Sequence, residues 1–163
     1  MFNVINGGKH AQMSADIQEF MIVPVGLETF NKKLQAGSEI FHTLKKILAS
    51  RGFATTVGDE GGFALPPHHS NTDAIELIIE ATSESGYKAG TEVKISLDVA
   101  ASELYEAESY NFKSESKKFT SIELIDYYSS AIKKYPILSI EDGLDESDWD
   151  GWSHMQGLIG KDV

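Results

Sequence analysis

The chain has 163 residues, no cysteine, and 25 acidic against 14 basic side chains, which gives a formal net charge of −11. The lack of cysteine excludes disulfide scaffolds and thiolate metal sites, and the negative charge argues against binding to the phosphate backbone of nucleic acids. Hydrophobic residues make up 41% of the chain, which is enough for the core of one domain, and no apolar run approaches the roughly 20 residues of a membrane-spanning helix.

Short β-type runs alternate with helical patterns along the chain. Strands are predicted where β-branched and aromatic residues cluster before glycine, proline or acidic residues, at 2–6, 17–25, 53–57, 93–98 and 137–142. Helices are predicted where apolar residues recur at three- and four-residue steps, at 30–51, 71–85, 121–135 and from about residue 147 onward. The alternation therefore indicates an α/β fold with parallel strands.

Helix starts and buried faces follow from the same patterns. Thr29 is the predicted N-cap of the first helix, and Thr120 with Glu123 forms a predicted capping box. The apolar face of the first helix is expected to begin at Phe30 and Leu34, and that of the last helix at Trp149.

Two architectures are consistent with such an alternation, an open doubly wound sheet and a (β/α) barrel. A G-x-G-x-x-G turn would favour the first, and none is present. The acidic residues described next favour the barrel.

Three predicted strands run into acidic residues, which are Glu60 with its neighbour Asp59, then Asp98, then Glu141. A single acid after a strand is more often a turn residue or a helix cap than a ligand. In a parallel barrel, however, all strand ends open on one face, so these acids are expected to converge. Crowded carboxylates are relieved by a shared proton or a cation, and oxygen ligands suit Mg²⁺ or Ca²⁺.

Two further residues are candidates for the same face. Glu19 lies inside an apolar stretch, where a buried carboxylate is costly unless it is paired or functional. His10 follows Gly7 and Gly8 in a predicted loop, and taken alone it would be an ordinary surface histidine.

Five segments together resemble the enolase (phosphopyruvate hydratase) family: NVINGGKHA, DIQEFMIVPVG, VGDEGGFA, SLDVAASE and SIEDGLDESDWDGW. The resemblance implies an incomplete (β/α)8 barrel of the enolase type with about half of the strands. Residues 1–163 would then be part of the family's C-terminal barrel domain, without the N-terminal domain and the later barrel strands.

The resemblance also implies a reaction, the Mg²⁺-dependent reversible dehydration of 2-phosphoglycerate to phosphoenolpyruvate in glycolysis and gluconeogenesis. It implies catalytic roles for Glu60 and Glu19, substrate contacts for His10, Glu19 and Glu141, and magnesium ligation by Asp98 and Glu141. The family's base lysine and third metal carboxylate have no counterpart here, so the chain alone is expected to be inactive. A cytoplasmic homo-oligomer is expected for the longer parent, with a secondary pool at the cell surface or secreted.

Asp59 and Asp142 adjoin these site residues, and at most supporting roles are expected for them.

Other function classes remain open at this point. One is a binding module, either a self-associating half-barrel scaffold or a surface-binding protein with a second function. The predicted loop at 102–112 carries acids and no lysine, so it offers no lysine-rich docking site. Another is an enolase-superfamily enzyme that shares only the metal carboxylates, which the segments around Glu60 and His10 disfavour.

Overall fold

The computed structural model describes residues 1–8, 14–58 and 60–163. The elements are, in chain order, β1 (Phe2–Asn6), β2 (Glu19–Val23), α1 (Phe30–Ser50), β3 (Phe63–Ala64), α2 (Asn71–Glu84), β4 (Lys94–Asp98), the short 3₁₀ helix η2 (Ala101–Glu103), β5 (Tyr105–Glu106), β6 (Ser109–Phe112), β7 (Lys117–Phe119), α3 (Ser121–Lys134), β8 (Ile137–Glu141) and α4 (Trp149–Ile159). The predicted α/β class is confirmed.

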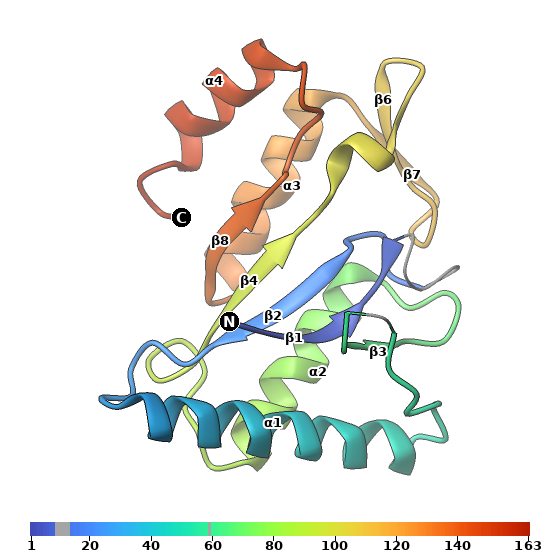
Figure 1. Cartoon of the computed structure of the whole chain (residues 1–163). Coiled ribbons are helices and arrows are strands. Elements are labelled where there is room, and N and C mark those ends of the chain that lie inside the picture. The colour runs from blue at the N-terminus through green and yellow to red at the C-terminus, as the bar shows by residue number, and fades with distance from the viewer. Residues whose placement is uncertain (9–13, 59) are drawn as a thin grey trace.

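The main sheet has the strand order β3-β1-β2-β4-β8 (Figure 1). Strand β1 is parallel to β3, and β4 is parallel to β8, but β2 is antiparallel to both of its neighbours. The expectation of an all-parallel sheet is therefore wrong at β2. Strand β2 runs back along β1 in the opposite direction, with Asn6 at the end of β1 paired with Glu19 at the start of β2.

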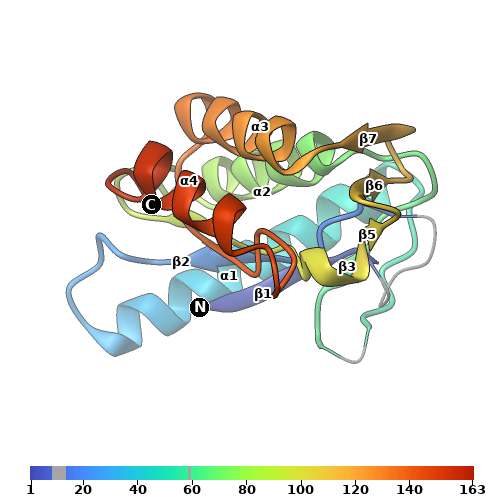
Figure 2. The same ribbon diagram turned by 90° about the horizontal axis from the view of Figure 1, so that it is seen from above.

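Among the described residues this sheet does not close on itself, because β3 and β8 each pair on one side only. The expectation of an incomplete barrel is confirmed. Helices α2 and α3 lie behind the sheet in Figure 1 and next to each other in Figure 2. The two helices are linked by a hydrogen bond of 2.7 Å, which the Tyr135 hydroxyl donates to the Glu76 carboxylate.

Residues 105–119 form a second, small sheet with the order β5-β6-β7. This corrects the expectation of a loop at 102–112. Tyr110 and Phe112 alternate with polar residues along β6 and are fully buried, so this hairpin has its own contact with the core.

The helix boundaries follow local capping chemistry. The Thr29 side chain accepts a hydrogen bond from the Lys32 amide, and Thr120 with Glu123 makes both bonds of the predicted capping box. Helix α2 begins with a second capping box, between Ser70 and Asp73. The described helices are also too short or too polar to cross a membrane.

The predicted apolar faces of α1 and α4 start too early. Phe30 is 76% exposed, Leu34 is 49% exposed and Trp149 is 78% exposed. The buried stretch of α1 begins only at Ala36, one and a half turns into the helix, so its first apolar residues precede the contact with the core. Trp149 is the first residue of α4 and precedes the buried Met155 and Ile159 in the same way.

Candidate active site

Four polar side chains form a row across one end of the main sheet, where β1, β4 and β8 end and β2 begins. Asn6 at the end of β1 pairs with Glu19, Glu19 pairs with Asp98 at the end of β4, and Asp98 pairs with Glu141 at the end of β8. Directly paired residues of neighbouring strands project to the same face of a sheet. We refer to Glu19, Asp98 and Glu141 as the acidic row.

The reversed direction of β2 is what brings Glu19 into this row. Glu19 is the first residue of its strand, whereas Asp98 and Glu141 are the last residues of theirs. If β2 ran parallel to β4, its first residue would lie at the other end of the strands, away from Asp98. Glu19 was predicted as a candidate for this face, but the direction of its strand was not predicted.

Glu60 approaches the row from a turn. Residues 53–56 are not a strand, and Val57 makes only an isolated bridge to Phe63, so the predicted strand at 53–57 is wrong. The Asn6 side-chain amide donates a hydrogen bond to the Glu60 carboxylate at 3.2 Å, and the Asn3 amide donates to the Glu60 carbonyl at 3.4 Å. These two asparagines tie the turn to β1.

Two glycines permit this close packing. A Cβ atom on Gly62 would lie inside contact distance of the Asn6 side-chain oxygen and 2.9 Å from the Asn6 backbone nitrogen. A Cβ atom on Gly7 would collide with the carbonyl oxygens of Ala15 and Ile17. A larger residue at either place would push apart the segments that carry Glu60 and Glu19.

Burial and the neighbouring carboxylates raise the pKa values of two acids of the row, Glu19 and Asp98. Burial, a hydrogen bond with Glu60, and the charges of Glu60, Asp98 and Glu141 raise the pKa of Glu19 from 4.5 to about 7. Burial also raises the pKa of Asp98, with further contributions from Glu141, Asp142 and Glu60, while the Ala100 amide donates to its carboxylate at 3.1 Å and opposes the rise. Glu19 therefore holds a proton at a higher pH than an ordinary glutamate does.

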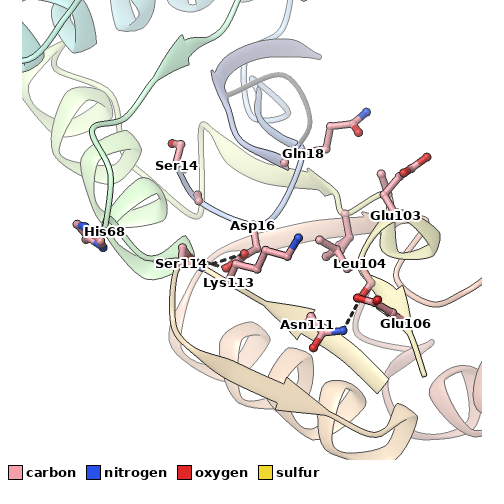
Figure 3. Close-up of a pocket in the computed structure, with 14 residues that line it drawn as sticks. Ser14, Asp16, Gln18, His68, Glu103, Leu104, Glu106, Asn111, Lys113 and Ser114 are labelled. Atoms are coloured by element: carbon pink, nitrogen blue, oxygen red, sulfur yellow. Dashed lines mark hydrogen bonds between the residues drawn. The ribbon is translucent and has the colours of Figure 1, made fainter. Parts of the chain in front are cut away.

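A cavity of about 550 Å³ lies next to the row, bounded by residues 14–18, the segment after β4 and the turn between β6 and β7 (Figure 3). Gln18, which precedes Glu19, and Val99, which follows Asp98, both line it. On its far side the Ser114 amide and hydroxyl donate hydrogen bonds to the buried Asp16 carboxylate, which joins the turn to the segment before β2. The cavity therefore adjoins the acidic row without being lined by its acids.

The family model described as "Enolase, C-terminal TIM barrel domain" matches residues 1–163. The chain belongs to the enolase family. This confirms the resemblance carried by the five sequence segments. The match also identifies the open five-stranded sheet as part of a barrel.

Of the residues predicted for the enolase site, Glu19, Asp98 and Glu141 lie side by side, and Glu60 is joined to them through Asn6 and Glu19. His10 and Asp59 lie outside the described residues. Asp142 follows Glu141 with a positive φ of 47° and is exposed. Its charge contributes to the raised pKa of Asp98, and its carbonyl accepts a hydrogen bond from the Ala101 amide at 2.9 Å.

Sequence reasoning missed Asn6. It is fully buried, and its amide reaches both the Glu60 carboxylate and the Gln18 carbonyl. The signal was an amide side chain at the end of a strand directly before two glycines, where a buried polar group needs partners.

The donor chemistry of the row fits the magnesium ion that enolases use. Asp98 and Glu141 are oxygen donors on neighbouring strands, and the mutual repulsion of the carboxylates is what a divalent cation would relieve. Within the described part of the chain, no three His, Cys, Asp or Glu side chains are grouped closely enough to hold a metal by themselves. Two protein carboxylates are nevertheless a normal complement for Mg²⁺, which keeps several waters.

Proposed function

We propose that the acidic row, Glu60 and His10 form part of the active site of an enolase that interconverts 2-phosphoglycerate and phosphoenolpyruvate with Mg²⁺, as a hydro-lyase of glycolysis and gluconeogenesis. The observation that carries the proposal is the contact between Glu19 and Glu60 beside Asp98 and Glu141. Burial of Glu19 and this contact together raise the pKa of Glu19 to about 7. Family membership supports the same reaction.

The Glu19–Glu60 pair would supply the proton for dehydration. A hydroxyl group leaves readily only when it is protonated, and a general acid works best when its pKa lies near the working pH. Two neighbouring carboxyl groups that cannot both ionise easily hold such a proton. In the reverse direction the same pair would accept a proton from the attacking water.

Asp98 and Glu141 would hold Mg²⁺, which when bound supplies the positive charge that offsets negative charge developing on the substrate carboxylate. Glu19, Glu141 and His10 would contact the substrate.

The 163-residue chain is proposed to bind Mg²⁺ weakly and to lack activity alone, since none of its lysines matches the family's base and a third metal carboxylate has no counterpart. Magnesium titration followed by the carboxyl carbon signals of Asp98 and Glu141 tests the metal assignment. We expect both signals to move together in the unmodified chain and neither site to saturate in a D98N variant. The exposed Glu84, at the far end of α2, provides a matched control as E84Q.

Two results would overturn this proposal. Formation of phosphoenolpyruvate from 2-phosphoglycerate by the isolated chain would refute its inactivity. Magnesium binding that is unchanged in D98N would refute the role of the row as the metal site.

A second function, self-association of the open sheet, is favoured by one observation. Strand β8 pairs with β4 only, and three of its five residues are half-buried at that edge. Unpaired strand edges invite pairing with another chain. Light scattering that shows a concentration-dependent dimer, which a proline at Ser139 abolishes, would support this function for the chain in the cytoplasm or at the cell surface.

A further inference from the structure

Asp16 and Ile17, which lie three and two residues before Glu19 of the acidic row, are held by a side chain distant in the sequence. The Asn71 side-chain oxygen accepts hydrogen bonds from the backbone amides of Asp16 at 2.9 Å and Ile17 at 3.0 Å. Asn71 is the first residue of α2 and is fully buried. We call this arrangement the Asn71 clamp.

Asn71 holds the backbone amides of this segment, whereas Ser114 holds the Asp16 side chain. The carbonyl groups of Ala15 and Gln18 are engaged on the other side, by the amides of Gly8 at 2.8 Å and Gly7 at 2.9 Å. Asp16 and Ile17 are buried, so without Asn71 their amides would lose the partner that a buried amide needs.

The orientation of the clamp is fixed from behind. The Asn71 side-chain nitrogen donates to the Glu115 carboxylate at 3.2 Å, and the same carboxylate accepts from the Tyr127 hydroxyl at 3.4 Å and the Lys117 ammonium at 2.8 Å. Because the Asn71 nitrogen is bonded to Glu115, the Asn71 oxygen faces the amides of Asp16 and Ile17.

We propose that Asn71 is a positioning residue for Glu19 of the acidic row. By holding the amides of Asp16 and Ile17, it fixes the start of β2 and keeps Glu19 paired with Asp98. Its consequence for catalysis rests on the enolase function proposed above, whereas its structural effect does not. Asn71 touches neither the acids of the row nor a reacting group, so it acts through the backbone alone.

The test compares N71A with S70A in the full 163-residue chain. N71A removes the acceptor of the clamp, and S70A removes the N-cap of the same helix without touching residues 16–17. In N71A we expect amide exchange at Asp16, Ile17 and the first residues of β2 to accelerate about tenfold relative to exchange at Leu44 in α1. In N71A, the nuclear Overhauser cross-peaks between backbone protons of Glu19 and Asp98 should also weaken. S70A should change neither measurement.

A rescue separates positioning from general stability. N71D keeps the acceptor but sets a second carboxylate against Glu115. In the N71D/E115Q double variant, the amide introduced at 115 donates to the carboxylate introduced at 71. We expect N71D to lose protection at Asp16 and Ile17, and the double variant to regain most of it.

Equal exchange in N71A and the unmodified chain would overturn the proposal. So would a loss in S70A as large as in N71A, or a double variant no better than N71D. Magnesium titration of the same samples reports on the metal assignment separately, because Asp98 and Glu141 are not held by Asn71 and their response should survive in N71A. A chain that never binds Mg²⁺ but shows the exchange pattern would retain the clamp and lose the proposed metal site.

Discussion

Replacing Glu19 with glutamine should make the metal-free chain more stable at alkaline pH and leave its stability at acid pH unchanged. The folded state raises the pKa of Glu19 from 4.5 to about 7, so the folded chain binds a proton more tightly than the unfolded chain does. Stability is then lost as pH rises from about 4.5 to about 7, because deprotonation is costlier in the folded state. Below this range Glu19 is neutral in both states and contributes no difference.

The magnitude follows from the same values. A difference of one in pKa corresponds to about 1.4 kcal/mol, so a fully buried group with this change would contribute about 3 kcal/mol. Glu19 is only partly buried, and solvent screens its neighbours, which lowers the expected value to roughly 1–2 kcal/mol.

The assay is urea unfolding followed by circular dichroism at pH 4 and pH 8 in the presence of a chelator. The quantity of interest is the free energy of unfolding of E19Q minus that of the unmodified chain, with E84Q as the control for removing one distant acid. A gain that appears only at pH 8 is expected for E19Q. An equal difference at both pH values would refute the crowding of carboxylates in the row.

Three further changes test the packing around the site. Y128F removes the buried hydroxyl that donates to the Gly143 carbonyl at 2.9 Å. Urea titrations should show a free energy of unfolding lower by about 1–2 kcal/mol. No loss would mean that this bond is not formed in solution. G157A places a methyl group in open space on α4 and should raise the melting temperature, with a gain of about 0.5–1 kcal/mol; a loss would contradict the described helix. G62A should instead destabilise the chain and shift the amide signals of Asn6, since its Cβ has no room beside that residue, and unchanged Asn6 signals would contradict the turn geometry.

Local chemistry made the helix boundaries predictable. The capping box between Thr120 and Glu123 depends on residues three apart, so the sequence contains all of it. The positions of Asp98 and Glu141 at the ends of strands were predictable for a similar reason, since each follows a short apolar run.

The direction of β2 and the exposure of Phe30 were not predictable in this way. The 12 residues between β1 and β2 can return the chain on either side of a sheet, and only pairing with both β1 and β4 decides the direction. Likewise, Phe30 satisfies the helical period, but burial depends on where α1 meets the core, which is a tertiary property.

The run at 53–57 shows a third limit. Its threonines and valine have high β-propensity, yet propensity forms a strand only where a partner edge is available. Here the pairing with β1 is taken by Phe63 and Ala64, so the earlier run stays irregular.

The antiparallel pairing of β1 and β2 has a consequence for the order of folding. Asn6 and Glu19 come together by closing a connection of a dozen residues, whereas Glu19 meets Asp98 only across more than 70 intervening residues. Short closures form orders of magnitude faster than long crossovers. The hairpin is therefore expected to offer a template edge, and the strands that bring Asp98 and Glu141 complete the site by adding to it.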